Sequence, residues 1–135
     1  MGGKLESPSY KQVCRQSNDD PKSDTHAEVF YFEYDPKEAE YSALVEYFYR
    51  FHDPTTLNKQ GNDAGPQYRS AIFYYGDDQK KIAEEVTAKV AQGHWKGKKI
   101  VTQITAAEKF YSAEDYHQLY LEKNPGGYCN HRLLW

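Results

Sequence analysis

The sequence contains little sulfur, no long apolar run and no excess of charge of one sign. Of its 135 residues, two are cysteine (Cys14 and Cys129) and one is methionine. Two cysteines without metal-ligand spacing exclude a disulfide-rich secreted scaffold and a zinc finger. The 17 basic and 20 acidic residues give a net charge of −3, so no basic patch indicates binding to nucleic acid or an anionic membrane. Apolar runs such as 72–75 are too short to span a bilayer.

Aromatic residues, by contrast, are abundant, with 13 tyrosines and six phenylalanines. The content of 39 % hydrophobic and 27 % charged residues is typical of a soluble globular protein, and the length suits one domain over 1–135. No glycosylation sequon and no basic-then-apolar leader occurs in this stretch. We therefore expect a reducing, cytoplasmic setting, although a targeting signal upstream of Met1 stays open.

Residue patterns divide the chain into alternating strands and helices. Aromatic and β-branched runs predict strands over 26–34, 68–75 and 99–105. Apolar spacing predicts helices over 39–51, from Asp77 or Asp78 to Gly93, and over 113–121. This alternation predicts an α/β sandwich with helices packed on a sheet.

The remaining segments are predicted to be irregular. Glycine, proline, asparagine and aspartate are concentrated over 53–67, which predicts a long loop. Residues 1–25 are polar and offer no core stripe, so we expect them to wrap the surface. The domain then has an α/β core over 26–122 and an irregular tail over 123–135.

Glu28 is the first candidate for chemistry, because it lies in the aromatic run beside Val29 and Phe30. If its side chain faces inward, desolvation raises the pKa of the carboxyl and makes it a proton donor near neutral pH. A lone strand glutamate more commonly faces solvent. The residues alone leave both interpretations open.

Four further residues have an ordinary interpretation beside a functional one. Asp63 could be a turn aspartate, and Tyr68 and Tyr10 could be core or surface rings. His117, with Glu114 and Asp115 nearby, could imitate a metal cluster, but a solvated helix face is the more common arrangement. From composition and spacing, the sequence predicts no more than a polar, aromatic-lined pocket.

The two thiols have different sequence contexts. Cys129 follows Gly-Gly-Tyr in the tail, which favours a mobile, exposed thiol suited to disulfide exchange. Cys14 has no such context, and we expect it to be dispensable.

Six segments together resemble the peptide methionine sulfoxide reductase A family over residues 2–129. They are His26-Ala-Glu-Val, Tyr34-Asp-Pro, His52-Asp-Pro-Thr-Thr, Gln60-Gly-Asn-Asp, Gln67-Tyr-Arg-Ser-Ala-Ile, and the stretch from Phe110-Tyr through Ala-Glu-Asp-Tyr-His-Gln and Lys-Asn-Pro to Gly-Tyr-Cys129. Enzymes of this family reverse the oxidation of methionine to its sulfoxide.

The resemblance implies a ferredoxin-like α/β sandwich and a repair enzyme for oxidative damage that needs no cofactor and no metal. In the family, a cysteine in Gly-Cys-Phe-Trp-Gly attacks the sulfoxide sulfur, releases methionine and becomes a sulfenic acid. A second cysteine then forms a disulfide, which thioredoxin reduces. The implied substrate is methionine S-sulfoxide, free or in oxidised proteins, and the implied state is a monomer without nucleic acid or membrane partners.

By this resemblance, Glu28 matches the proton donor and Cys129 the resolving thiol. Asp63, Tyr68 and Tyr10 match the groups that bind the sulfoxide oxygen or water. Donors of this kind stabilise developing charge in a pocket with little water.

The departures from the family pattern concern the nucleophile. No Gly-Cys-Phe-Trp-Gly occurs in the 135 residues, and Gly2-Gly3 matches positions downstream of that motif. We therefore expect an N-terminally truncated domain without its first strand and helix. Pro66 stands beside Tyr68 where the family usually has threonine, and the stretch between Cys14 and His26 is longer than usual.

Two functions of different class remain. In one, the sequence is a reductase that has lost its N-terminus. In the other, it is a catalytically inactive fragment that at most binds a partner. An in-frame Gly-Cys-Phe-Trp-Gly in the genomic sequence upstream of Met1 would favour the first.

Overall fold

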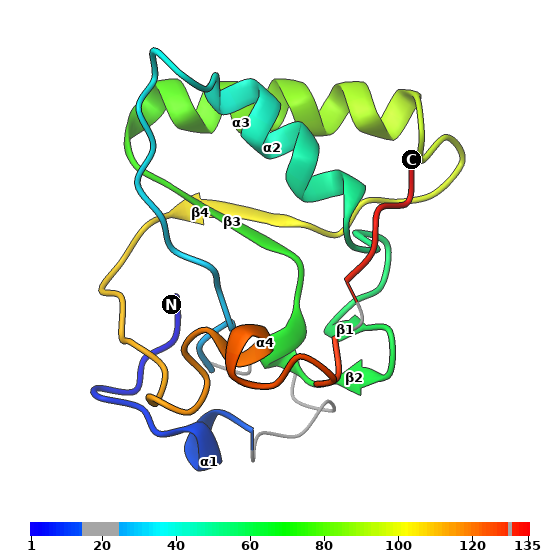
Figure 1. Ribbon diagram of the computed structural model, residues 1–135. Coiled ribbons are helices and arrows are strands. Elements are labelled where there is room, and N and C mark those ends of the chain that lie inside the picture. Colours follow the sequence, from blue (N-terminus) through cyan, green and yellow to red (C-terminus); the bar gives the residue numbers. More distant parts are fainter. Residues whose placement is uncertain (15–24, 130) are drawn as a thin grey trace.

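The computed structural model describes residues 1–14, 25–129 and 131–135. Its helices are α1 (Tyr10–Val13), α2 (Tyr41–Arg50), α3 (Gly76–Gln92), α4 (Tyr120–Lys123) and a 3-10 helix (Pro66–Tyr68), and its strands are β1 (Lys59–Gln60), β2 (Asp63–Ala64), β3 (Ala71–Tyr74) and β4 (Gln103–Ala106). Figure 1 shows α2 and α3 together on one side of β3 and β4, with α1 and α4 on the opposite side of the molecule. No helix in the described part of the chain is long and apolar enough to cross a membrane.

The centre of the fold is a strand–helix–strand unit. Strands β3 and β4 pair in parallel, with Ala71 opposite Gln103 and Tyr74 opposite Ala106. Parallel strands need a long crossover connection, and α3 supplies it. The α/β class predicted from the sequence is therefore confirmed.

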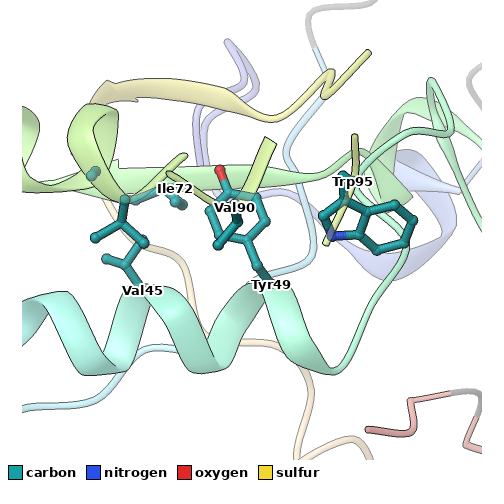
Figure 2. Close-up of a cluster of buried hydrophobic side chains, with 7 residues drawn as sticks. Val45, Tyr49, Ile72, Val90 and Trp95 are labelled. Carbon is teal, nitrogen blue, oxygen red and sulfur yellow. The ribbon is translucent and has the colours of Figure 1, made fainter. Parts of the chain in front are cut away.

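The main hydrophobic core lies between the two long helices and the parallel strands. It contains Val45, Tyr49, Ile72, Ala83, Val86, Val90 and Trp95. Figure 2 shows Val45 and Tyr49 of α2 directed toward Ile72 and Val90. The hydroxyl of Tyr49, which is fully buried, lies 2.7 Å from Thr87 Oγ1, so its polar atom is satisfied.

A buried polar network joins the end of α2 to both parallel strands. His52 Nδ1 donates to Phe48 O at 2.6 Å, so Nε2 accepts from the Ser70 hydroxyl at 2.7 Å. Ser70 Oγ also lies 2.8 Å from Thr102 Oγ1. Burial lowers the pKa of His52 to about 4, and the ring is therefore neutral at pH 7.

The predicted strand over 26–34 is wrong. The segment is extended, but only its start makes backbone hydrogen bonds to neighbouring segments among the described residues. Ala27 N donates to Met1 O and Glu28 N donates to Gln67 O, both at 2.9 Å. Beyond Glu28 the residues to 34 are assigned no strand pairing. Aromatic and β-branched composition favours a strand only when a neighbouring strand accepts its hydrogen bonds.

The sequence predicted α3 and β3 close to their observed positions, whereas several other boundaries differ. Strand β4 starts later than the predicted 99–105, and α4 replaces a helix expected over 113–121. The N-cap of α3 is Tyr75 rather than Asp77 or Asp78, and both aspartates lie in the first turn. Tyr75 N donates instead to Gln79 Oε1 at 2.8 Å.

The N-terminal segment is less peripheral than expected. Met1 is buried, and its amino group donates to Ala27 O at 3.0 Å. Helix α1 also interrupts the predicted irregular stretch over 1–25, whose residues 15–24 lie outside the described residues. The loop predicted over 53–67 holds the short β1–β2 hairpin and the start of the 3-10 helix.

Candidate active site

Side chains from four segments meet on the side of the molecule opposite α2 and α3. We call Tyr10, Cys14, Glu28, Asp63 and Tyr68 the acid cluster. Electrostatic interactions among these five groups link α1, the extended segment after Ala27, the hairpin and the 3-10 helix. The sequence separation of the segments explains why no local motif predicts the cluster.

Backbone contacts fix the positions of Glu28 and Tyr68 relative to one another. Glu28 N donates to the carbonyl of Gln67, the residue before Tyr68. Gly65 lies so close to the Gln67 amide that a side chain at Gly65 would collide with it, and its φ of 153° lies in the region that favours glycine. The glycine therefore permits the tight turn that presents Tyr68.

Glu28 has the electrostatic environment of a proton donor. Burial is the main cause that raises the pKa of its carboxyl, and the negative charge of Asp63 raises it further. The side chain nevertheless keeps access to solvent, which places it at the mouth of the site rather than in the interior. A substrate can therefore reach this acid.

Tyr10 and Cys14 are paired through one turn of α1. The hydrogen bond between the Tyr10 hydroxyl and the Cys14 thiol is the main cause that raises the pKa of Tyr10 to about 12. Cys14 is the C-cap residue of α1 and lies four residues after Tyr10, so both side chains share a helix face. Tyr10 is thus a protonated hydrogen-bond donor at neutral pH.

The position of Cys14 in the cluster was missed by the sequence analysis. Burial raises the pKa of its thiol, and nearby Glu28 does so too, while hydrogen bonds with Tyr10, Gln67 and Tyr68 act in the opposite direction. The net effect is upward, which keeps the thiol protonated and weakly nucleophilic at pH 7. The i, i+4 spacing of Tyr10 and Cys14 was the available signal.

Tyr68 and its neighbour Gln67 form the floor of the cluster. Burial is the largest cause that raises the pKa of the Tyr68 hydroxyl, followed by the charge of Glu28. Gln67 is buried, and its Oε1 has no hydrogen-bond partner among the described residues. A buried acceptor without a hydrogen-bond partner is energetically costly.

Glu28 and Tyr10 open into a cavity of about 650 Å³. The segment 110–122 forms its other wall. Glu114 in that wall accepts a hydrogen bond from Tyr10 N at 2.8 Å, and the rings of His117 and Tyr10 lie 4.8 Å apart. His117 therefore lines the cavity instead of a solvated helix face.

Cys129 is exposed, whereas Cys14 is partly buried. The expected difference in exposure between the two thiols is confirmed. Cys129 Sγ lies 3.7 Å from His131 Nδ1. Among the described residues, the polar group that contacts Cys129 therefore belongs to the tail and not to the acid cluster.

The chain matches the family model of peptide methionine sulfoxide reductase over residues 1–134. It is 49 % identical to a probable peptide methionine sulfoxide reductase of Schizosaccharomyces pombe, an alignment that covers 99 % of this chain and 76 % of that protein. It is 46 % identical to peptide methionine sulfoxide reductase MsrA 1 of Rhodopirellula baltica, covering 96 % of this chain and 64 % of the relative.

Solved structures give the same result. Mxr1 of Saccharomyces cerevisiae in reduced form superposes with a TM-score of 0.83 at 41 % identity, over 98 % of this chain and 70 % of Mxr1. Methionine sulfoxide reductase A of Corynebacterium diphtheriae gives 0.71 at 36 % identity, over 95 % and 62 % of the two chains. On the family match and these identities, the chain belongs to the peptide methionine sulfoxide reductase family.

Proposed function

We propose that these 135 residues carry the proton-donating and resolving parts of a thiol-dependent reductase of methionine S-sulfoxide, a repair activity for oxidised proteins and free methionine. The observation that carries the proposal is Glu28, a carboxyl whose pKa is raised at the edge of a large cavity. Membership in the family supplies the reaction.

Glu28 is the proton donor of this reaction. When a thiolate attacks the sulfoxide sulfur, the S–O bond is weakened and its oxygen must gain a proton. A carboxyl with a raised pKa is still protonated at a pH where an ordinary glutamate is ionised. The upward direction of the Glu28 shift supports this role.

Tyr10, Tyr68 and Asp63 hold the sulfoxide oxygen or the water formed from it. Both tyrosines keep their protons at pH 7, since their pKa values are raised. A protonated hydroxyl can donate to an oxygen on which negative charge develops. Asp63 contributes negative charge that keeps Glu28 protonated.

Cys129 is the resolving thiol, and thioredoxin is the reductant of the resulting disulfide. Thiol exchange requires that a thiolate reach the sulfur of its partner. The exposure of Cys129 in a tail that follows two glycines supports this role.

The nucleophile is not among the 135 residues, so we propose that this chain alone does not turn over methionine sulfoxide. Neither thiol is suited to replace it. The raised pKa of Cys14 disfavours its thiolate, and Cys129 is assigned to resolution. The two aromatic side chains that hold the substrate methyl group in the family are also absent.

The alternative is an inactive chain that at most binds a partner. The exposed aromatic segment favours it: Phe30 is 86 % exposed, and its ring stacks on that of Phe32 at 5.3 Å. Exposed apolar patches commonly mark interaction surfaces.

The test is a chain extended upstream by a segment with the family's Gly-Cys-Phe-Trp-Gly. We expect this chain to reduce methionine S-sulfoxide, and Glu28→Gln in it to lower kcat about 100-fold or more, as expected for loss of a general acid. Glu114→Gln is the matched control in the opposite wall of the cavity, with a smaller effect. An inactive extended chain would favour the binding alternative, and an unchanged kcat in Glu28→Gln would refute the proton-donor assignment.

A further inference from the structure

The end of the tail, Leu134 and Trp135, is hydrogen-bonded to the helical layer, which is formed by α2, α3, β3 and β4. Leu134 N donates to Arg50 O at 2.7 Å, and Arg50 Nε donates to Trp135 O at 3.0 Å. The Trp135 ring lies parallel to that of His94, with centroids 4.2 Å apart and an interplanar angle of 5°. These contacts hold the last residues against the end of α2 and the turn after α3.

His131 lies between this fastened end and Cys129. Its ring meets Phe51 edge-on, with centroids 5.5 Å apart, and its Nδ1 is 3.7 Å from Cys129 Sγ. Phe51 is the C-cap residue of α2, so the helix end orients the imidazole. Gly126 and Gly127 precede Cys129 and give the other side of the tail its conformational freedom.

We propose that His131 is the general base that activates Cys129. This inference rests on the proposed function of Cys129 as the resolving thiol. A neutral imidazole nitrogen within hydrogen-bond reach of a thiol can accept its proton, and only the thiolate is the effective nucleophile in disulfide formation.

The step balances without an added oxidant. The Cys129 proton passes to His131 Nδ1, and the thiolate attacks the sulfur of the cysteine sulfenic acid formed when methionine sulfoxide gives up its oxygen. The new S–S bond forms as the S–O bond breaks, and the oxygen leaves as water with the proton returned by the imidazolium. Two electrons pass from the Cys129 sulfur to the sulfenic sulfur. The sulfenic acid is therefore the oxidant, and the disulfide is the oxidised product.

The helical layer contributes two neighbours of His131. Phe51 contributes an apolar ring, and His52 interacts electrostatically with His131. His52 is neutral near pH 7, because its pKa is lowered to about 4. Cys14 lacks such a base: its hydrogen-bond partners are two hydroxyls and an amide.

The experiment measures how fast iodoacetamide alkylates Cys129 in the full 135-residue chain, from pH 6 to pH 10. Peptide mass spectrometry follows the peptide between Lys123 and Arg132, which contains Cys129, and Cys14 serves as an internal reference. We expect His131→Gln to slow alkylation of Cys129 at pH 7 several-fold, and the rates to converge at high pH, where hydroxide removes the proton. Alkylation of Cys14 stays unchanged.

The control variant is His94→Gln, which removes the ring stacked on Trp135 without touching Cys129. We expect this variant to react at the wild-type rate at each pH. Equal rates for wild type and His131→Gln at pH 7 would overturn the proposal, as would a change of the same size at every pH, the signature of a structural role. The measurement needs no sulfoxide turnover, so it fails or succeeds independently of the proposed activity.

Discussion

The helical layer and the side that carries the acid cluster are held together in different ways. In the layer formed by α2, α3, β3 and β4, apolar side chains from all four elements close a common core. On the opposite side, short elements are joined by a few backbone hydrogen bonds, such as Glu28 N to Gln67 O, and by ring contacts such as that between Tyr31 and Phe110. The comparison indicates that the first region supplies most of the stability, whereas the second carries the candidate site.

Two aromatic residues illustrate the difference. Tyr49 is fully buried, with its hydroxyl bonded to Thr87, whereas Phe30 is 86 % exposed. Burying an aromatic side chain stabilises a fold by about 1.5–3 kcal/mol, while an exposed ring contributes little. The abundance of aromatics in the sequence therefore does not translate into a uniformly aromatic core.

The largest expected effect is the difference in the free energy of unfolding between a substitution in the helical layer and one on the opposite side. Ile72→Ala removes a side chain from the core and should lower the free energy of unfolding by about 2–5 kcal/mol. Phe30→Ala, on the other side, should change it by no more than about 0.5 kcal/mol. Urea unfolding followed by circular dichroism measures both, and a larger loss for Phe30→Ala would reverse the comparison.

The buried histidine makes the helical layer sensitive to acid. His52 binds its proton near pH 6.5 in the unfolded chain but near pH 4 in the folded one, so the unfolded state binds more protons between these values. Stability is fully present above about pH 6.5 and falls as the pH decreases, by roughly 3 kcal/mol at pH 4 from this group.

Denaturant unfolding between pH 4 and 8 measures this loss, and nuclear magnetic resonance titration of the imidazole measures the folded-state pKa directly. A folded-state midpoint near 6.5 for His52 would contradict the account.

A smaller effect is expected for the hydroxyl of Tyr49 in the core. Tyr49→Phe keeps the ring but leaves Thr87 Oγ1 without the tyrosine hydroxyl at 2.7 Å. Thr87 still donates to Ala83 O at 2.6 Å, so no donor is orphaned. The cost should be about 1 kcal/mol in thermal or urea unfolding. No measurable loss would mean that packing alone holds Tyr49.

The smallest perturbation compares the two thiols without any substitution. N-ethylmaleimide at pH 7 should modify Cys129 faster than Cys14, because Cys129 is exposed and burial raises the pKa of Cys14. Mass spectrometry of the labelled chain distinguishes the two sites. Faster modification of Cys14 would contradict the assignment of roles.

The sequence predicted the helical layer better than the side that carries the chemistry. Periodic apolar residues such as Val86 and Val90 mark a helix because their spacing reflects the burial of one face, and both are buried. The run 26–34 has strand composition, but its pairing depends on partners distant in sequence, which local patterns do not contain. For the same reason, the helix predicted over 113–121 is not found there, and α4 spans Tyr120–Lys123 instead.

The candidate site was reached only through the family resemblance. Nothing local links Glu28 to Asp63 or Tyr68, which are joined by the folding of the hairpin and the 3-10 helix beside the extended segment. The positions of Cys14 in the cluster and of His117 at the cavity were not predicted, for a related reason. Their environments depend on Tyr10, which α1 carries into contact with both.

The central claim is that these 135 residues hold the acid and the resolving thiol but not the nucleophile. The most direct measurement is an assay of the purified 135-residue chain with methionine S-sulfoxide and either dithiothreitol or thioredoxin. We predict no sustained turnover by this chain, and activity in the chain extended upstream with Gly-Cys-Phe-Trp-Gly. Sustained turnover by the 135 residues alone, abolished by Cys14→Ser, would contradict the account and identify Cys14 as the nucleophile.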